Sequence, residues 1–466
     1  MTKASTPDFD GDQDLAALAE ARSKARQARI AFEAFEGADQ DRIDKIVQAM
    51  AQAGTAAAKE LARLAVDETG YGVYEDKILK NLYNTKFVAA YMAGLRTIGV
   101  LWVDEKNRMT AVGSPMGVIA GIIPVTNPTS TVLFKCLAAV KSGNAIVCAP
   151  HPRAVRCCAR TAQVMAEAAV AAGAPRGLIS CLENVSLEAT QELMRHPDIS
   201  LIMATGGAGM VRAAYSCGKP TLAVGPGNVP VYVHRSVRDV AEAALMIITS
   251  KAFDNGTACV AEQSVVLDEP IADAILSAFA AQGTLFLERA DQDKLARLVF
   301  TERGDLRPEA VGLSAAELAR RIGVSAPPGV RVLAAVLTEV GRNVPLSAEI
   351  LGPVLSIYRA RDVDAAISRC REILALGGAG HTLGIHAEDD ETIAKLSTLP
   401  ASRIVINTPT LFGGMGYSCA TDPSFMLGTG TWSGSIVSDN VTPLHLINIK
   451  RIAHEIRPWR SLYKDL

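Results

Sequence analysis

The sequence has almost no net charge and few aromatic side chains. Its 466 residues carry 47 Lys and Arg against 49 Asp and Glu, a formal net charge of −2, and Phe, Tyr and Trp make up 5%. Charges so evenly balanced provide no electrostatic attraction for nucleic acid or for an anionic membrane surface. We therefore expect a small-molecule partner, with no nucleic acid and no membrane.

Long apolar runs and paired cysteine motifs are also missing. No apolar run approaches the roughly 20 residues of a membrane-spanning helix, and the segment from Met1 to Asp10 is too acidic and polar for a secretory signal. The nine cysteines include no Cys-x-x-Cys pair, which argues against a disulfide framework and against a zinc site. These features predict reduced thiols, no metal and a cytoplasmic protein.

What the sequence does contain is enough apolar material for a sizeable core. Hydrophobic residues make up 49% and charged residues 21%, which predicts two or three domains. Residues from about 14 to 95 have the spacing of several amphipathic helices. Residues 99–113 then form two short apolar runs around a polar turn, which predicts a hairpin. A protruding hairpin often joins subunits.

From Pro115 onward, short apolar strands alternate with helices. Strands are predicted at 117–124, 145–148, 178–182, 201–204 and 229–233, and helices at 129–141 and 154–172. This alternation predicts a parallel sheet of Rossmann type, although no Gly-x-Gly-x-x-Gly follows its first strand. A helix at 237–251 comes next, and the alternation from 267 to 406 predicts a second α/β domain.

A single thiol, Cys259, stands between the turn Asp254-Asn255-Gly256 and a predicted strand at 264–267. A thiol on a turn at the mouth of a sheet can reach a substrate. Most free cysteines, however, are small buried side chains. This segment alone leaves both interpretations open.

Two further turns are candidates for ligand contacts. Asn127 stands between two prolines just before a predicted helix, where its amide could donate to an oxyanion or could merely form the turn. The stretch from Thr205 to Gly209 follows a strand and opens a helix, so its glycines would let the backbone approach a ligand closely. Glycine-rich turns of this kind are common, and neither signal is specific by itself.

Six segments taken together resemble the CoA-acylating aldehyde dehydrogenases. That branch includes the acetaldehyde and propionaldehyde enzymes and the aldehyde half of bifunctional aldehyde/alcohol dehydrogenases. The likeness runs in order from about residue 15 to about 458, and its segments are 116–131, 150–154, 204–211, 252–263, 377–382 and 403–409. Because the chain ends at Leu466, no alcohol dehydrogenase domain is expected.

The resemblance implies an α/β aldehyde dehydrogenase fold. Its Rossmann-like cofactor domain would comprise residues 1–98 and 114–233, and its α/β catalytic domain residues 234–435. The hairpin at 99–113 and the tail at 436–466 would form the oligomerisation element of a homodimer or homotetramer.

The resemblance also implies roles for individual residues. Cys259 would be the nucleophile, with Asn127 and the Cys259 main-chain N–H as an oxyanion hole. His381 would assist proton movement or would make a structural hydrogen bond. Glu349 would hold the nicotinamide ribose, although by itself it reads as a surface Glu before a turn. The cofactor contacts implied are Pro124, Val125, Thr126, His151, Pro152, Arg153, Thr205, Gly206, Gly207, Gly209, Met210, Val224, Gly225, Glu349 and Pro353.

One departure from the wider superfamily bears on the reaction. Hydrolytic members carry a general-base Glu in a Leu-Glu-Leu-Gly-Gly-Lys stretch, where this chain has Ala223 and Val224. Neither side chain can take a proton from water, and general-base help contributes roughly 10²- to 10⁴-fold. The expected reaction therefore uses CoA to accept the acyl group. A hydrolytic, CoA-independent enzyme and a non-catalytic relative remain the alternatives.

The segment from His151 to Ala154 bears on the cofactor. Hydrolytic relatives carry Lys-Pro-x-Glu there, and the Glu disfavours a 2′-phosphate. Here a small neutral residue replaces it beside Arg153, which suits a phosphate. NAD-using acylating relatives share this run, so it permits NADP without demanding it. We expect NADP or NAD as cofactor, CoA as co-substrate, and a short-chain aldehyde or sulfoacetaldehyde as substrate.

Overall fold

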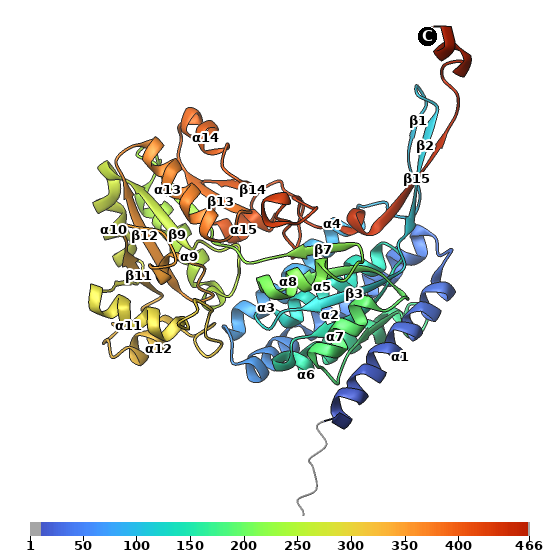
Figure 1. The fold of residues 1–466 in the computed structure, drawn as a ribbon, viewed down its shortest axis with the longest axis horizontal. Coiled ribbons are helices and arrows are strands. Elements are labelled where there is room, and N and C mark those ends of the chain that lie inside the picture. Colours follow the sequence, from blue (N-terminus) through green and yellow to red (C-terminus); the bar gives the residue numbers. More distant parts are fainter. Residues whose placement is uncertain (1–10, 465–466) are drawn as a thin grey trace, which may run out of the picture.

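The computed structural model describes residues 11–464, so the features predicted for Met1 to Asp10 lie outside the described residues. Two parallel sheets and one small antiparallel sheet organise the chain (Figure 1). The predicted N-terminal helices are confirmed: they are α1 (Gly11–Phe35), α2 (Gln40–Thr69), α3 (Tyr74–Leu82), the π-helical turn η1 (Tyr83–Val88) and α4 (Ala89–Ala93).

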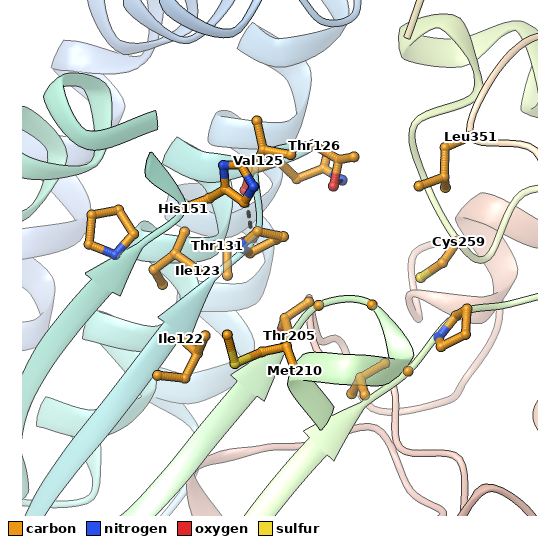
Figure 2. Close-up of a pocket in the computed structure, with 18 of the residues that line it drawn as sticks. Ile122, Ile123, Val125, Thr126, Thr131, His151, Thr205, Met210, Cys259 and Leu351 are labelled. Carbon is orange, nitrogen blue, oxygen red and sulfur yellow. Dashed lines mark hydrogen bonds between the residues drawn. The ribbon is translucent and has the colours of Figure 1, made fainter. Parts of the chain in front are cut away.

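The first sheet has five parallel strands in the order β5-β4-β3-β6-β7, which confirms the Rossmann-type prediction. The strands are β3 (Val118–Ile123), β4 (Ala145–Pro150), β5 (Ile179–Cys181), β6 (Ile199–Thr205) and β7 (Thr221–Val224). The helices between them are α5 (Pro128–Lys141), α6 (Val155–Ala171), α7 (Leu187–Arg195) and α8 (Ala208–Tyr215). The strand order reverses between β3 and β6, and ligands bind at the carboxyl ends of such a switch point. Figure 2 shows Ile122, Ile123 and Thr205 at these strand ends.

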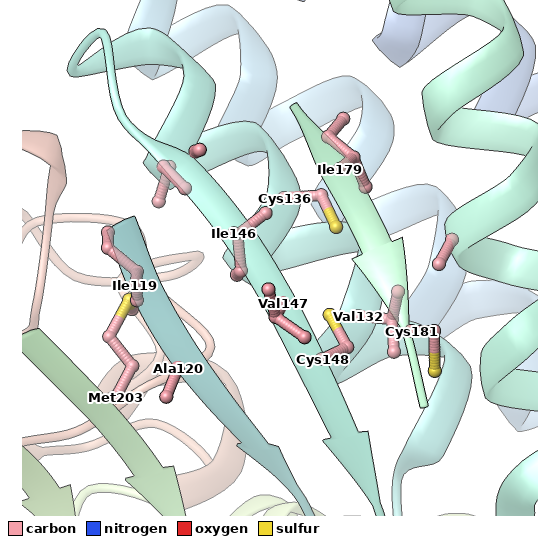
Figure 3. Packing of buried hydrophobic residues seen from close by; sticks show 14 of the residues in the cluster. Ile119, Ala120, Val132, Cys136, Ile146, Val147, Cys148, Ile179, Cys181 and Met203 are labelled. Atoms are coloured by element: carbon pink, nitrogen blue, oxygen red, sulfur yellow. The ribbon is translucent and has the colours of Figure 1, made fainter. Parts of the chain in front are cut away.

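The core of this sheet explains why its strands read as continuous apolar runs. Every residue of β3 and β4 is buried because helices cover both faces of the sheet. Cys136 of α5 packs with Cys148 and Cys181 of the strands (Figure 3), so these thiols act as small apolar side chains. One polar exception is Lys135, whose Nζ donates to the carbonyls of Ile122 at 2.6 Å and Met203 at 2.8 Å. It ties β3 to β6 beside the switch point.

The second sheet has seven parallel strands in the order β10-β11-β12-β9-β8-β13-β14. They are β8 (Pro230–Val233), β9 (Ser264–Asp268), β10 (Thr284–Phe286), β11 (Val332–Val336), β12 (Val354–Ala360), β13 (Gly380–His386) and β14 (Ala401–Ile406). The accompanying helices are α9 (Val240–Ala252), α10 (Ala272–Ala281), α11 (Arg289–Val299), α12 (Ala315–Arg321), α13 (Val363–Leu376), α14 (Asp390–Leu396) and α15 (Thr410–Gly414). This sheet is the predicted second α/β unit.

The sequence predicts that the strand at 229–233 belongs to the first sheet, and that prediction is wrong. Val231 of β8 pairs with Val265 of β9 on one side and with Gly384 of β13 on the other. The boundary between the two sheets therefore falls between β7 and β8. An apolar run predicts a buried strand, but its pairing partners here lie as far as 150 residues away and leave no local signal.

A three-stranded antiparallel arm projects from the body of the molecule (Figure 1). The predicted hairpin is confirmed as β1 (Gly99–Asp104) and β2 (Met109–Pro115), and β15 (Ile447–Ala453) pairs with the other edge of β2. Large apolar side chains are exposed on the arm and the following tail: Val100, Trp102, Val103, Ile449, Ile452, Ile456 and Trp459. No helix in the part of the chain that the structure describes is both long and apolar enough to cross a membrane.

Candidate active site

A pocket of about 540 Å³ lies where the carboxyl ends of the first sheet face the loop that carries Cys259. Its walls come from the ends of β3, β4, β6 and β7 on one side, and from Cys259, Glu349 and Leu351 on the other. Figure 2 shows Thr205, Met210 and Cys259 facing this shared space. The structure thus brings together the candidate nucleophile and the turn predicted to contact the cofactor.

The turn before Cys259 has an unusual backbone. Asp254 and Asn255 have φ angles of 50° and 52°, and Gly256 has a φ of 69°. A Cβ on Gly256 would stand 2.4 Å from the carbonyl oxygen of Gly352, so this position requires glycine. Non-glycine residues adopt positive φ only where surrounding contacts hold them. Here the Asp254 carboxylate accepts from the main-chain N–H of Val73 at 2.7 Å.

Cys259 is half-buried, with its sulfur directed into the pocket (Figure 2). Burial and then the nearby Glu349 carboxylate raise the pKa of this thiol to about 12, while the Arg403 guanidinium opposes the rise. Cys259 is therefore a protonated thiol in the ligand-free pocket at neutral pH. Activation requires a change in its surroundings or a proton acceptor when ligands bind.

Asn127 ends the loop after β3 and precedes α5, and its side chain is held at both ends. Its Oδ1 accepts from Lys80 Nζ at 2.7 Å, and its Nδ2 donates to the Thr257 carbonyl at 3.1 Å. Its side chain makes no N-cap hydrogen bond to α5, so the helix-entry explanation does not account for it. The amide belongs to the wall of the pocket close to the Cys259 loop.

Lys77, Lys80 and Asp254 form a buried cluster that sequence reasoning missed. Lys80 Nζ lies 2.5 Å and Lys77 Nζ 3.0 Å from the same oxygen of Asp254. A signal did exist: Lys77 and Lys80 are three residues apart, which places both on one face of α3. The sequence does not indicate which residue this face contacts, because Asp254 is more than 170 residues away.

β7 ends at Val224, one of the two candidates for the position of the hydrolytic general base. Val224 lines the pocket, whereas Ala223 is buried beneath it. Glu349 is the acidic residue among the described residues that line the pocket, and its carboxyl group accepts a hydrogen bond from the main-chain N–H of Gly227 at 2.8 Å. Burial raises the pKa of Glu349 to about 8. Neither Ala223 nor Val224 has a side chain that can take a proton from water.

Most of the cofactor contacts expected from the sequence share the pocket. The residues that line it are Pro124, Val125, Thr126, His151, Pro152, Thr205, Gly206, Gly207, Met210, Val224, Gly225 and Glu349. Thr205 Oγ1 is buried and has no hydrogen-bond partner among the described residues. Gly207 is the N-cap of α8 and has open space where a side chain would stand. An orphaned hydroxyl beside an open helix N-terminus fits a dinucleotide phosphate.

Arg153, a residue expected beside a cofactor phosphate, is not among the residues that line the pocket. Its guanidinium donates to Tyr71 Oη at 2.8 Å and to the Thr69 carbonyl at 2.9 Å, and lies 4.7 Å from the centre of the Tyr71 ring. These contacts turn it toward the α2–α3 connection. Gly209, in the first turn of α8, and Pro353, just before β12, also lie outside the lining residues.

His381 is fully buried in β13 and does not line the pocket either. Burial and the neighbouring Arg403 hold the pKa of its imidazole well below its usual range. Its Nδ1 lies 3.0 Å from Thr382 Oγ1, and its Nε2 has no partner in the described structure. A Cβ on Gly227 would contact both His381 and the Cys259 carbonyl. The imidazole is thus a neutral group close to the main chain that carries the thiol.

Two sets of pocket residues had no motif to reveal them. One set surrounds the start of α7 and comprises Val185, Ser186, Leu187 and Thr190. The other set is apolar, packs with Ala258 and Val260 beside the nucleophile, and comprises Met415, Phe425 and Leu427. Both come from loops whose approach to the site depends on the tertiary fold.

Comparison with known proteins identifies the architecture. The model of the aldehyde dehydrogenase family matches residues 11–422. The chain belongs to this family. It is similar to an acetylating aldehyde dehydrogenase from Geobacillus thermoglucosidasius, whose crystal structure has a TM-score of 0.93 at 45% identity over 96% of this chain and 98% of that one.

Curated relatives of this chain include two kinds of enzyme. The bifunctional aldehyde-alcohol dehydrogenase AdhE of Escherichia coli K12 is 39% identical over 97% of this chain and 51% of that protein. The acylating sulfoacetaldehyde dehydrogenase of Cupriavidus necator is 35% identical over 97% of this chain and 92% of the relative. The chain spans about half the length of the bifunctional relatives that it matches. The resemblance and the α/β fold predicted from the sequence are confirmed.

The raised pKa of Cys259 makes a prediction about chemical modification. Because the thiolate is the reactive form, iodoacetamide should alkylate Cys259 slowly at pH 7.5, and the rate should rise about tenfold per pH unit up to pH 10. Mass spectrometry of Cys259 peptides after timed quenching measures this rate. A rate that levels off below pH 9 would show that the ligand-free pocket stabilises the thiolate.

Proposed function

We propose that this protein oxidises a small aldehyde with CoA and NAD or NADP to the acyl-CoA and the reduced cofactor, reversibly, through a thioester on Cys259. One observation carries the proposal: the pocket sets a thiol beside an oriented amide, while the end of β7 supplies Val224 where a water-activating carboxylate would stand. The similarity to enzymes named as acetylating and acylating supports it.

The residues of the pocket suit each step. Cys259 Sγ bonds to the carbonyl carbon of the aldehyde as the thiol proton passes to solvent, and the electron pair of the C=O bond moves onto oxygen. The Asn127 amide donates to that oxygen, together with the main-chain N–H of Cys259. A nicotinamide cofactor held along Thr205, Gly207 and Glu349 would supply the acceptor for the hydride that leaves this carbon as its C=O bond re-forms. The thioester that remains on Cys259 is attacked by the CoA thiol, which takes the acyl group and restores the Cys259 thiol.

The apolar wall beside Cys259 favours an uncharged aldehyde. Met415, Phe425 and Leu427 line this part, and no Lys or Arg is among the pocket-lining residues that the structure describes. Burying a sulfonate or carboxylate without a partner carries a large desolvation penalty. Of the two substrates expected from the sequence, we therefore propose a short-chain aliphatic aldehyde over sulfoacetaldehyde.

The proposed location is the cytoplasm. All nine cysteines are free in the structure, five of them in the cofactor-domain core or its helices. Unpaired thiols in this number suit a reducing compartment.

The nucleophile and the acyl acceptor are tested together. With acetaldehyde or propionaldehyde, reduced cofactor and acyl-CoA should form in equal amounts, and omitting CoA should lower steady-state turnover at least about 10²-fold because no base activates water. Absorbance at 340 nm and liquid chromatography of the CoA products measure the two. Cys259→Ala should abolish both.

The hydrolytic and non-catalytic alternatives give different results in the same assay. Undiminished turnover without CoA, with free carboxylic acid as product, would establish the hydrolytic reaction. An inactive wild-type protein that binds neither cofactor nor CoA would establish the non-catalytic one. Normal turnover of Cys259→Ala would remove the nucleophile assignment.

We also propose a homodimer or homotetramer joined through the arm and the C-terminal tail. The arm exposes the apolar side chains of Trp102, Val103 and Ile452, which contact with another subunit would bury. β1 and β15 are the two edge strands of the three-stranded sheet, and their outer edges are unpaired. Light scattering at micromolar concentration should give at least twice the mass of one 49.2 kDa chain. Val103→Lys on the exposed strand should weaken the assembly, and a monomeric wild-type protein would contradict the proposal.

For the cofactor, we propose that NADP is accepted, because Ala154 stands where hydrolytic relatives carry a Glu and the nearby pocket residue His151 is not a carboxylate. His151 lines the pocket at the end of β4, where a carboxylate would repel a 2′-phosphate, whereas Arg153 is held by Tyr71. His151→Glu should lower kcat/KM for NADP at least about tenfold relative to NAD. Arg153→Ala is the matched control and should change the ratio less. A wild-type preference for NAD above about a hundredfold, near 3 kcal/mol, would contradict the proposal.

A further inference from the structure

Behind the proposed oxyanion donor lies the buried cluster of Lys77, Lys80 and Asp254. The three side chains are 3% exposed or less. Lys80 Nζ reaches three oxygens: Asp254 Oδ2 at 2.5 Å, Asn127 Oδ1 at 2.7 Å and Thr257 Oγ1 at 3.3 Å. Each hydrogen of the ammonium group therefore has an acceptor, and one of these acceptors belongs to the residue that would stabilise the oxyanion.

An ammonium group donates and cannot accept, whereas the amide of Asn127 has an oxygen on one side and an NH₂ group on the other. Only the oxygen can face Lys80, because the reversed amide would set NH₂ against NH₃⁺. The NH₂ group is consequently turned to the opposite side, where it donates to the Thr257 carbonyl at 3.1 Å. Its other hydrogen meets only Thr126 Oγ1, at a long 3.4 Å.

We propose that Lys80 is a positioning residue, which keeps the NH₂ group of Asn127 turned toward the carbonyl oxygen of the substrate while Asp254 holds Lys80 in place. The inference rests on the proposed function, because it assumes that Asn127 donates to that oxygen. Contact with the cation also polarises the amide and makes its N–H groups stronger donors.

Asp254 connects the contact between Lys80 and Asn127 to the turn that carries the nucleophile. Its main-chain N–H donates to Asp76 at 2.7 Å, and its carboxylate accepts from Thr257 Oγ1 at 2.8 Å, two residues before Cys259. Although burial opposes it, the two ammonium groups hold the pKa of the Asp254 carboxyl below its ordinary value. One anion thus fixes both the Cys259 turn and, through Lys80, the amide opposite.

Lys77 provides a matched comparison. It contacts the same Asp254 oxygen at 3.0 Å, but its second acceptor is the main-chain carbonyl of Thr126, also at 3.0 Å. Removing Lys77 takes one charge from the cluster and leaves the contact between Lys80 and Asn127. Removing Lys80 releases the amide and leaves Asp254 paired with Lys77.

The test is a double-mutant cycle on acylation of Cys259 by p-nitrophenyl acetate, which requires neither CoA nor a nicotinamide cofactor. Sγ bonds to the acyl carbon, the ester C–O bond breaks, p-nitrophenolate leaves, and the thiol proton passes to buffer. The burst of p-nitrophenolate is followed at saturating and subsaturating ester in Lys80→Met, Lys77→Met, Asn127→Ala and the Lys80→Met/Asn127→Ala double variant.

Lys80→Met should slow the acylation rate constant about 10²-fold with little change in the half-saturating ester concentration, as expected for loss of one oriented donor. The double variant should be no slower than Asn127→Ala, because Lys80 acts through that amide. Lys77→Met should slow acylation less than about tenfold. If Lys80→Met does not fold, Lys80→Gln enters the same cycle, since its amide can rotate and no longer enforces one orientation.

The proposal would be overturned if the double variant were slower than Asn127→Ala by the full factor that Lys80→Met alone causes. It would also be overturned if Lys80→Met and Lys77→Met slowed acylation equally. Either result would show that Lys80 has a general structural role. A wild-type burst no larger than that of Cys259→Ala would remove the nucleophile and this proposal together. A normal burst in a protein that makes no acyl-CoA from any aldehyde would instead refute only the proposed function, and the cycle would still decide the role of Lys80.

Discussion

The burial of Asp254 between two lysines is the interaction on which the rest of the site depends. Its turn has positive φ angles that non-glycine residues avoid. The carboxylate compensates by accepting from a main-chain N–H, a hydroxyl and two ammonium groups. Buried ion pairs of this kind add little net stability compared with apolar packing, but breaking one is strongly destabilising because a charge is left alone. The cluster is better explained by the geometry it enforces than by the stability it provides.

The surroundings of Cys259 favour the protonated thiol, which is the less reactive form of this side chain. Burial raises the pKa of the Cys259 thiol to about 12 and that of the Glu349 carboxyl to about 8, so the thiol is protonated at neutral pH. A thiol that stays protonated until ligands arrive is protected from oxidation and from stray electrophiles. Arg403 and, to a smaller extent, Lys80 are cations whose fields oppose this rise in the pKa of the thiol. Arg403 donates to the carbonyls of His381 and Gly428 at 2.7 Å each, which anchors the loop that follows α15.

The sequence predicted those parts of the molecule whose causes are local. Continuous apolar runs identified β3 and β4, helical spacing identified α5 and α6, and the polar turn identified the hairpin of β1 and β2. Cys259, Asn127 and Glu349 were found because their segments resemble a known family, and the pocket does contain them. Features that depend on contacts between distant parts of the chain were missed or predicted wrongly. β8 belongs to the second sheet because it pairs with β13. Lys80 was overlooked because its partner, Asp254, lies far along the chain. Arg153 was misplaced because Tyr71 and Thr69, which no pattern connects to it, hold it away from the pocket.

The place of β15 in the arm also constrains how the protein is made. β2 lies between β1, only a turn away, and β15, which begins more than 330 residues later at Ile447. During synthesis, one edge of β2 therefore stays open until residues 447–453 have left the ribosome. An open, partly apolar edge is a template for pairing with other chains, and contacts of such long sequence separation form slowly. The arm is the last of the three sheets that can be completed, so assembly through it would select chains in which β15 has already been made.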